Sequence, residues 1–457
     1  MSFPKYANYR ESFVQWLGEV PRHWNVAQMK RVVATPITDG PHETPSFKDE
    51  GIPFVSAEAV SSGKVDFERI RGFISQADHE RFCQKYRPRI VDIYMVKSGA
   101  STGTTAIVEE NREFSIWSPL AAIRCDSNTD CRFLLHFMRS RHFQEAIALN
   151  WSFGTQQNIG MNVIENLQVT LPPLAEQRTI AAFLDRETAK IDSLVAEQRR
   201  LIELLKEKRQ AVISHAVTKG LNPDVRMKPS GIEWLGDVPE HWTVGPIKRF
   251  LKTTQGAIKT GPFGSHLTSA DMQSGEVKVY TQRNVIDCDF ESGDSFISLA
   301  KFAELSSFEA FPGDILVTTR GTIGRAAILP ENAPRGILHP CLLRIQVDSS
   351  RISQEFLQLV IQDSDFLKTQ LALQSNATTI EVIYSHTIAS VIIPVPPVAE
   401  QCDILAFVAT IMCQFQLLNA ETERAIALLQ ERRTALISAA VTGKIDVRGL
   451  ASSGEVA

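Results

Sequence analysis

The sequence lacks several features that would place the protein in a familiar class. Its seven cysteines form no CxxC pair and have no histidine cluster beside them, which argues against a zinc site and favours free thiols in a reducing cytoplasm. No apolar run approaches the ~18 residues of a membrane span, and the first residues lack the apolar core of a secretory signal. We therefore expect a cytoplasmic chain with no membrane partner, and its length indicates about two to four domains.

The sequence also lacks an excess of positive charge. The net charge is −4, residues 21–170 hold 17 basic and 17 acidic side chains, and residues 239–394 hold 13 and 16. Many DNA-binding domains carry a clear basic excess, so any phosphate-binding surface of this chain must be local. The same balance slightly favours an alternative, a non-catalytic coiled-coil scaffold that presents two protein-binding domains.

Catalytic motifs are missing as well. The run GAIKTGPF from Gly256 has Pro262 where a P-loop needs lysine, no Asn-Pro-Pro-aromatic run occurs, and the histidines form no HExxH or HxxxH pattern. Asp271, Glu276 and Lys278 could be read as nuclease carboxylates with a lysine, but their spacing is crowded and has no counterpart in the first half. We expect no catalytic and no metal-binding residues, and a self-sufficient nuclease or methyltransferase is a third, weaker hypothesis.

What the sequence does contain is an internal repeat. The run QWLGEVPRHW from Gln15 returns as EWLGDVPEHW from Glu233, with seven of ten residues identical. LPPLAEQ from Leu171 returns as VPPVAEQ from Val395, and ISHAVTKG returns as ISAAVTGK. DIYMVKSGASTG is a fainter match to DILVTTRGTIG. Because the flanks repeat while the middles differ, we expect two copies of a unit that joins a domain to a connector.

Each connector is expected to be one long helix. Residues 175–217 and 399–441 contain neither Pro nor Gly, and each stretch has 43 residues, which as a helix would span ~65 Å. Prolines precede both stretches, and Gly220 and Gly443 follow them. Apolar residues recur every seven positions in the same phase in both stretches, which predicts a coiled coil. We expect its two helices to be antiparallel. This first series comprises Leu184, Ile191, Leu205, Val212, Val408, Phe415, Leu429 and Leu436.

A second apolar stripe is expected to complete the seam between the two helices. Its members are Leu194, Leu201, Ile411 and Leu418. Gln198 and Thr422 interrupt the first series at matching places in the two copies. The alternative is that each helix packs on its own domain as an ordinary core helix.

The middles are typical of mixed α+β domains. Short β-rich runs bounded by Gly and Pro, such as PGDILVTTRG, alternate with amphipathic stretches. The glycine-rich loops Ser98–Gly103 and Arg320–Gly324 are interpreted either as tight turns or as backbone-accessible loops that face phosphate. Three polar runs are either solvated or DNA-binding. They are TDGPHETP and TGPFGSH, near the start of the two middles, and RFCQKYRPR in the first middle. The candidate DNA contacts are His42, Lys97, Ser98, Gln156, Gln157, Lys259, His266, Arg320 and Arg325.

The repeated WLG-x-VP-x-HW, the PGDIL…RGTIG run, GTQQNI from Gly154 and the two PP-x-AEQ runs together resemble one family. The chain is similar to the specificity subunit of type I restriction–modification systems over about residues 9–446. The resemblance implies a non-catalytic subunit that reads a bipartite, asymmetric target in double-stranded DNA. It also implies two modification subunits, which methylate adenine with S-adenosylmethionine, and restriction subunits that translocate on DNA with ATP and cut it with Mg²⁺. SNATTIEVI stands in place of GTQQNI in the second half, which leaves the role of Gln156 and Gln157 without a counterpart there.

The resemblance divides this α+β chain into a pseudo-twofold repeat. It implies a first target-recognition domain at residues 1–172, with the repeated segment 9–32, and a spacer helix at 173–220. A second target-recognition domain is expected at 221–395, a second spacer helix at 396–446 and a tail at 447–457. Half-sites about 10 bp apart would let both domains approach one face of the DNA.

Overall fold

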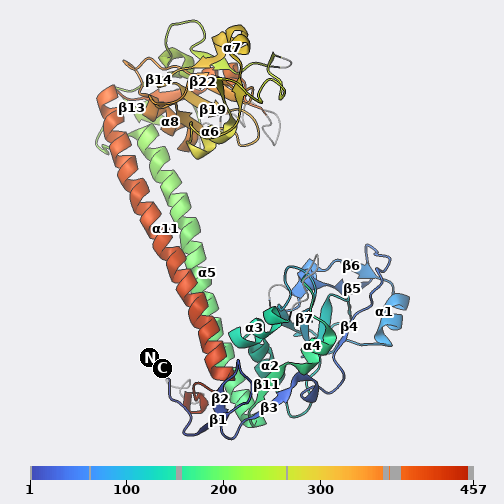
Figure 1. The fold of residues 1–457 in the computed structure, drawn as a ribbon. Helices are drawn as coiled ribbons and strands as arrows, with labels where there is room; N and C mark the ends of the chain where they lie inside the picture. The colour runs from blue at the N-terminus through green and yellow to red at the C-terminus, as the bar shows by residue number, and fades with distance from the viewer. Residues whose placement is uncertain are drawn as a thin grey trace. The chain divides into compact units, whose positions relative to one another are not determined.

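The computed structural model describes residues 3–60, 63–150, 157–263, 266–363, 370 and 382–450. The chain divides into two compact units, both drawn in Figure 1. Unit 1 comprises Met1–Arg199 and Glu423–Ala457, and unit 2 comprises Arg200–Thr422. Each unit therefore includes one part of each long helix, α5 (Leu174–Lys219) and α11 (Val398–Val441).

Unit 1 combines small sheets with short helices. Its four-stranded antiparallel sheet has the order β4 (Thr38–Asp39), β10 (Leu120–Ile123), β7 (Ile93–Val96), β8 (Thr105–Ile107). Its three-stranded sheet has the order β6 (Gly72–Ile74), β5 (Ile52–Val55), β9 (Ser115–Ile116), with β5 parallel to β9. Two pairs are β1 (Tyr9–Glu11) with β2 (Glu19–Pro21) and β3 (Asn25–Gln28) with β11 (Gln168–Leu171). The short helices are α1 (Gln76–Cys83), α2 (Cys131–Met138), α3 (Arg141–Leu149) and α4 (Met161–Asn166).

The helices α1, α2 and α3 of unit 1 begin at side-chain caps that the sequence provides. The Ser75 hydroxyl accepts from the Asp78 N–H at 3.1 Å at the start of α1. The Asp130 carboxylate accepts from the Phe133 N–H at 3.0 Å at the start of α2. Such caps satisfy backbone donors that no helical carbonyl can reach, so these helices begin where a short polar residue precedes an amphipathic run.

Unit 2 repeats this organisation. Its antiparallel sheet has the order β15 (Ile258–Thr260), β22 (Leu342–Ile345), β19 (Ile315–Thr318), β20 (Ala326–Ile328). The other sheet has the order β17 (Phe296–Ile297), β16 (Val277–Tyr280), β21 (Gly336–Leu338), β18 (Glu309–Ala310), with β16 parallel to β21. Two pairs are β12 (Met227–Pro229) with β13 (Asp237–Pro239) and β14 (Thr243–Pro246) with β23 (Ile392–Val395). The short helices are α6 (Gln282–Asp287), α7 (Leu299–Leu305), α8 (Gln354–Asp363) and α10 (Ser385–Ser390).

The two units share their organisation although their middles have diverged in sequence, and they differ in that the second sheet of unit 2 has a fourth strand, β18. In both, the strand with the PGDIL-like run (β7 or β19) is an inner strand of the four-stranded sheet. In both, a short helix (α4 or α10) precedes a strand (β11 or β23) that pairs with the strand after the WLG flank (β3 or β14). The predicted α+β class and internal repeat are therefore confirmed. The predicted domain limits remain predictions, because each compact unit joins parts of both long helices.

The long helices pack against each other antiparallel within each unit. In unit 1, Asp192 of α5 pairs with Arg433 of α11 at 2.8 Å, and Thr170, just before α5, donates to the Val441 carbonyl at 2.6 Å. In unit 2, the Arg209 Nε of α5 donates to Met412 Sδ of α11 at 2.9 Å. All eight residues of the first heptad series are buried or half-buried. The first seam series thus lies where the heptad spacing predicts it.

The predicted second stripe is wrong at three of its four positions. Leu194, Leu201 and Leu418 are exposed, and Ile411 is half-buried. The buried companions of the first series lie four residues further on, as with Val195 after Ile191. This second series is, in full, Thr188, Val195, Ile202, Arg209 and Ala216 on α5, and Met412, Asn419, Ile426, Arg433 and Ala440 on α11. The seam of a coiled coil alternates steps of three and four residues along each helix. Because the observed second series contains polar residues such as Arg209 and Asn419, the sequence did not show on which side of the first series it lies.

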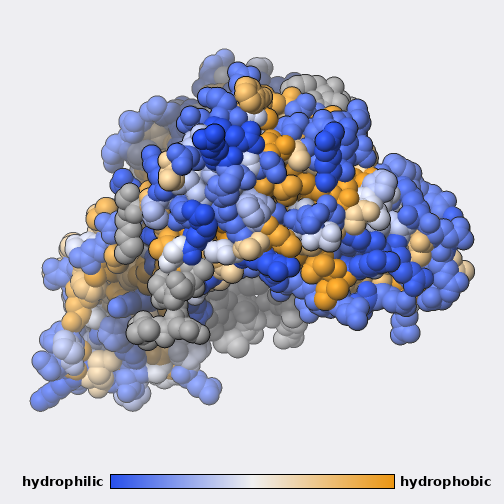
Figure 2. Space-filling model, turned by 90° about the horizontal axis from the view of Figure 1, so that it is seen from below, coloured by the Kyte–Doolittle hydropathy of each residue, from blue (hydrophilic) through white to orange (hydrophobic). Residues whose placement is uncertain are grey.

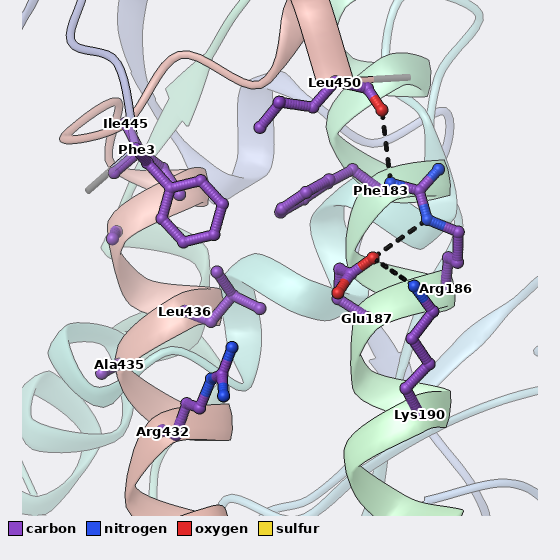
Figure 3. A pocket seen from close by; sticks show the side chains of 11 residues that line it. Phe3, Phe183, Arg186, Glu187, Lys190, Arg432, Ala435, Leu436, Ile445 and Leu450 are labelled. Carbon is purple, nitrogen blue, oxygen red and sulfur yellow. Dashed lines mark hydrogen bonds and ion pairs between the residues drawn. The ribbon is translucent and has the colours of Figure 1, made fainter. Parts of the chain in front are cut away.

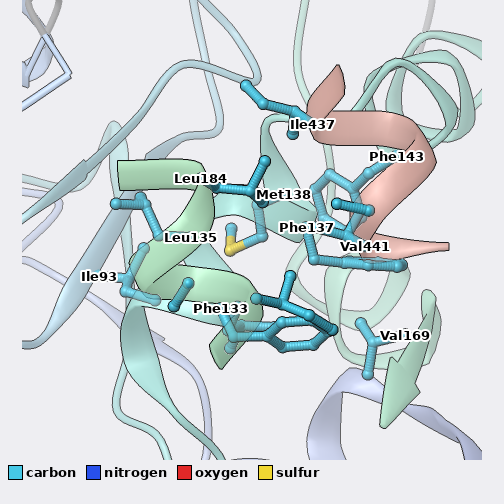
Figure 4. Close-up of a cluster of buried hydrophobic side chains, with 14 of the residues drawn as sticks. Ile93, Phe133, Leu135, Phe137, Met138, Phe143, Val169, Leu184, Ile437 and Val441 are labelled. Carbon is cyan, nitrogen blue, oxygen red and sulfur yellow. The ribbon is translucent and has the colours of Figure 1, made fainter. Parts of the chain in front are cut away.

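The core of unit 1 joins the helix pair to the sheet. Phe133, Leu135 and Phe137 of α2 belong to one buried cluster with Ile93 of β7, and Figure 4 shows this cluster. Leu184 of α5 and Ile437 of α11 belong to the same cluster. The alternative in which each helix packs only on its own domain is wrong for this unit, because α5 packs on its own domain and on α11 at once.

The helix α11 is apolar along much of its length. Within the described residues it is the one helix long and apolar enough to cross a membrane, judged by length and composition only. The same seam that pairs α11 with α5 accounts for part of this apolar character. The face drawn in Figure 2 is mostly hydrophilic, with hydrophobic side chains in separate patches.

Candidate functional site

The repeated WLG-x-VP-x-HW flank and the PP-x-AEQ run meet at a buried carboxylate in unit 1. Glu176 Oε1 accepts from Trp24 Nε1 at 3.1 Å and from the Tyr6 hydroxyl at 2.6 Å. His23 Nε2 lies 2.8 Å from Glu176 Oε2. Burial, and then the hydrogen bond to Glu176, raise the pKa of Tyr6 above its ordinary value. Glu176 therefore holds the flank on the start of α5.

Unit 2 repeats this anchor with one partner fewer. Glu400 Oε2 accepts from Trp242 Nε1 at 3.1 Å and lies 2.7 Å from His241 Nε2. Glu400 is also more exposed than Glu176, with 27% against 7% of the side chain accessible. The Trp, His and Glu of the repeats thus have a structural role that explains their recurrence.

The glutamine of each PP-x-AEQ run connects its long helix to the start of a short helix. In unit 1, Gln177 accepts from the Asp130 N–H at 2.8 Å and donates to the Pro172 carbonyl at 2.8 Å. In unit 2, Gln401 accepts from the Ser353 N–H at 2.8 Å and donates to the Pro396 carbonyl at 2.9 Å. Both amides are buried and fully used, so the run is a structural joint between helix and domain.

The aspartate of the PGDIL-like run is buried and paired in both units. Asp92 accepts from Arg124 at 2.7 and 2.8 Å. Asp314 accepts from Gln346 at 2.8 Å, and burial is the main cause that raises its pKa. Each carboxylate also accepts a backbone N–H within its own turn. These aspartates fix the strand that leads into the glycine-rich loop.

In both units the glycine-rich loop closes on a segment that comes later in the chain. Ser98 forms an isolated bridge with Asn158, and the Gly99 N–H donates to the Gln157 carbonyl at 3.0 Å. In unit 2, Arg320 bridges Val382 in the same way. Gln157 is exposed beside its loop, while Gln156 and most of SNATTIEVI lie outside the described residues. The loops are tight turns, and their exposed side chains remain candidates for DNA contact.

Two candidate residues of the first domain, Lys97 and His42, meet at Asp39. Lys97 Nζ lies 3.2 Å from Asp39 Oδ2 and its side chain is only 12% exposed. Lys85 Nζ and His42 Nε2 lie 2.5 and 3.1 Å from the same carboxylate. Burial opposes ionisation of Asp39, but the hydrogen bonds from Lys85 and Lys97 hold its pKa below the ordinary value. The charge of Lys97 is therefore balanced within the domain, whereas His42 is exposed.

The candidate residues of the second domain differ in their surroundings. Arg320 and Arg325 are exposed, and within the described residues neither has a carboxylate partner. The Arg320 guanidinium lies 5.9 Å from the centre of the Phe263 ring. Lys259 Nζ lies over the Phe308 ring at 4.4 Å, and burial followed by Arg344 lowers its pKa. His266 is exposed.

Sequence reasoning missed a hollow beside the Arg320 loop that is lined largely by polar residues. The hollow has a volume of about 490 Å³. Gln282 Nε2 on its wall donates to the Arg320 carbonyl at 2.5 Å. The remaining lining residues are Thr281, Arg283, Ile286, Asp287, His339 and Cys341. Burial and the charge of Arg320 lower the pKa of His339. The run YTQRNV was the only local signal, and nothing in it points to the distant His339.

The acidic residues considered for a metal site are not assembled into one. The Lys278 ammonium is buried and donates to the Glu291 and Ser292 carbonyls at 2.6 and 2.8 Å. Asp271 accepts from Thr268 in its own turn at 2.6 Å. No group of three or more metal-ligating side chains occurs in the part of the chain that the structure describes.

A pocket of about 800 Å³ opens between α5 and α11 in unit 1 (Figure 3). Phe3, Phe183 and Leu436 contribute apolar surface. Glu187 on its rim pairs with Arg186 at 3.0 Å and Lys190 at 3.1 Å. The residues that complete the lining are Arg432, Ala435, Ala439, Ile445 and Leu450. The pocket joins apolar side chains to a mainly basic rim.

Comparison with known proteins agrees with this geometry. The family described as Type I restriction modification DNA specificity domain matches residues 36–204 and 264–426. A protein of Methanocaldococcus jannaschii assigned as the MjaX type I restriction enzyme specificity subunit is 23% identical over 98% of this chain and 99% of its own. The EcoKI specificity subunit of Escherichia coli K12 is 21% identical over 96% of this chain and 93% of its own.

Solved structures share the fold. A chain from a structure described as the basis of complex assembly and conformational transition of the type I R-M system aligns with a TM-score of 0.66. It is 16% identical and covers 92% of this chain and 98% of that one. The HsdS subunit of Thermoanaerobacter tengcongensis aligns with a TM-score of 0.50 at 17% identity, covering 93% and 98%. The chain therefore belongs to the family of type I restriction–modification DNA specificity subunits, whose role is to recognise DNA and not to catalyse a reaction.

Proposed function

We propose that the two divergent domains read two different half-sites of one bipartite DNA target. The observation that carries this proposal is the contrast between repeated anchors and unlike loops. Glu176 and Glu400 hold the corresponding flanks of the two units in the same way. In contrast, the charge of Lys97 is balanced by Asp39, while Arg320 has no carboxylate partner in the described residues. Two modest binding surfaces on one chain gain affinity because the second contact is intramolecular.

We also propose that the repeated flanks and the long helices carry two modification subunits, with restriction subunits added to that assembly. Exposed hydrophobic side chains support this proposal. They are Leu194, Leu201 and Leu204 on α5, and Phe407, Leu417, Leu418 and Leu428 on α11. An apolar face of a long helix that its seam partner leaves uncovered suits a helical partner. The pocket of unit 1 offers such a partner an additional apolar site with basic residues.

In this proposal the partners bring the chemistry. S-adenosylmethionine, ATP and Mg²⁺ belong to the modification and restriction subunits, and this chain binds none of them. The complex acts in the cytoplasm. The role of this chain is to place the methyltransferase and the nuclease at a chosen sequence.

The test is an exchange of one domain. Residues 33–165 are replaced by the corresponding region of another specificity subunit, and methylated adenines are mapped across the host genome. We expect one half-site to change while the other half-site stays as it was. A matched exchange of residues 250–390 should change the other half-site. A change of both half-sites after either exchange would refute modular reading.

The scaffold alternative predicts a different result. An electrophoretic mobility shift of the assembled complex, with unlabelled competitor DNA, measures its binding to the mapped target. Loss of the shift in a chain that lacks residues 33–165 supports DNA reading by the domain. A complex that assembles with its partners and binds no DNA would support the scaffold.

A further inference from the structure

The turn between β1 and β2 presents a phenylalanine in an unusual way. Phe13 has φ +61°, one of three non-glycine residues with positive φ in the described chain. Its side chain is 92% exposed, more than any other large hydrophobic residue there. A bulky side chain in the left-handed region is strained, and an aromatic ring in water loses the benefit of burial. Two unfavourable features at one residue call for a compensating contact.

The internal repeat supplies a reference for this position. Gly231 occupies the corresponding place in unit 2, with φ +77°. Both turns are closed alike: the Val14 N–H donates to Ser12 Oγ at 3.1 Å, and the Ile232 N–H donates to Ser230 Oγ at 3.1 Å. The turn therefore requires the left-handed conformation in both copies. Glycine satisfies it without strain, so Phe13 is there for its side chain.

The turn is firmly held beneath Phe13. Ser12 donates its N–H to the Gly18 carbonyl at 3.0 Å, and Lys444 donates to the Glu19 carbonyl at 2.8 Å. Trp16 stacks on His142 with ring centres 6.3 Å apart. A rigidly presented aromatic side chain binds at a low entropic cost, as the anchor residues of protein interfaces do.

The surroundings of Phe13 indicate the chemistry of its partner. Glu11 and Glu19 lie opposite each other across the β1–β2 pair, and both are exposed. Gln15 is exposed between them in sequence. Both carboxylates are exposed on the strand pair that carries the turn, whereas the nearby cations Arg10 and Lys444 donate to the Trp24 and Glu19 carbonyls. This surface therefore has no excess of positive charge to bind DNA phosphates or anionic lipid headgroups. Exposed carboxylates suit a protein pocket that is apolar inside and basic at its edge.

We propose that Phe13 is an anchor that inserts into an apolar pocket of the modification subunit docked on the first flank. This inference rests on the proposed function. The second flank has Gly231 at this position and offers no such anchor. The two modification subunits therefore bind with unequal affinity, the first more tightly than the second.

The test is a titration of the intact chain with purified modification subunit, with Phe13→Gly compared to the wild type. We expect two unequal dissociation constants for the wild type, and an increase of at least tenfold in the smaller one for the variant. Thermal unfolding of Phe13→Gly should be unchanged or shifted upward, because glycine relieves the backbone strain. Leu149→Ser, which removes another highly exposed side chain of unit 1, should leave both constants unchanged.

Other outcomes overturn the inference. If Phe13→Gly and the wild type bind the modification subunit equally, Phe13 is not an anchor, and the proposed function is unaffected. Wild-type chain that binds no modification subunit would instead refute the proposed docking itself. Normal assembly with a weakened DNA shift would assign Phe13 to DNA. Self-association of the wild type by sedimentation that Phe13→Gly abolishes would assign it to a second copy of this chain.

Discussion

At the scale of single residues, buried polar groups join distant parts of the sequence. Glu176 accepts from Trp24 and Tyr6, which lie 152 and 170 positions away. Removing one partner of a buried hydrogen bond costs more than the bond contributes, because the other group stays buried without a partner. The repeated Trp, His and Glu therefore stabilise the fold, and their recurrence alone does not identify a DNA contact.

We expect Glu176→Ala to destabilise the protein more than Glu400→Ala. Glu176 is buried and holds a tryptophan and a tyrosine, while Glu400 holds a tryptophan and is partly exposed. The loss should be about 2–4 kcal/mol for the first and about 1–2 kcal/mol for the second. Urea unfolding of both variants measures the difference, and equal losses would contradict the ranking.

Arg320 and Arg325 should contribute to DNA affinity more than Lys97 does. Both arginines are exposed, while Lys97 is paired with Asp39. If each arginine contacts a phosphate, replacing both with alanine should lower the slope of log affinity against log salt by about 2. Lys97→Met should leave that slope nearly unchanged and lower the free energy of unfolding instead. Binding titrations at several salt concentrations distinguish these results.

At the scale of elements, the long helices show how far a periodic pattern can be followed. The first heptad series was predicted correctly, and the neighbouring series was assigned to Leu194 and Leu201, which are exposed. Apolar residues stand on both sides of the first series, so composition could not decide which side faces the partner helix. The packed pair decides it, and the leucines on the other side remain open for a further partner.

Neighbouring residues provide a matched test of this seam. Val195 is 8% exposed and Leu194 is 44% exposed. Val195→Glu places a charge in the seam and should cost about 3 kcal/mol or more of the free energy of unfolding. Leu194→Glu should cost less than about 0.5 kcal/mol, as for surface substitutions, and should weaken binding of the modification subunit. A large loss of stability for Leu194→Glu would return that residue to the seam.

At the scale of the whole molecule, two domains are connected by helices without internal breaks. α5 and α11 have 46 and 44 residues, and each contributes to both compact units. A continuous helix cannot change its length without unfolding, because every turn is held by backbone hydrogen bonds. The proposed bipartite target therefore has a gap that depends on the length of these helices.

An insertion near Gln198 tests the dependence on helix length. Four added residues lengthen a helix by about 6 Å and keep its faces nearly in phase, because they make about one turn. We expect methylation mapping to find the same half-sites with an altered gap. A control insertion of four residues in the tail after Leu450 should leave the gap unchanged. Altered half-sites with a fixed gap would refute the proposal.

Much of the fold follows from local and periodic features of the sequence. The absence of Pro and Gly over 43 residues, twice, was enough to predict α5 and α11. The repeated flanks predicted two copies of one organisation, since similar sequences meet the same local constraints. Family membership followed from the order of the repeated motifs, because that order is specific.

Tertiary structure alone decided the contacts between distant residues. No sequence pattern shows that Lys97 is neutralised by Asp39 or that His339 lies beside Arg320. Nor does a pattern place Phe13 in water with a left-handed backbone where its repeat has Gly231. Local preferences act over a few residues, whereas charge pairing and exposure depend on which parts of the chain the fold brings together.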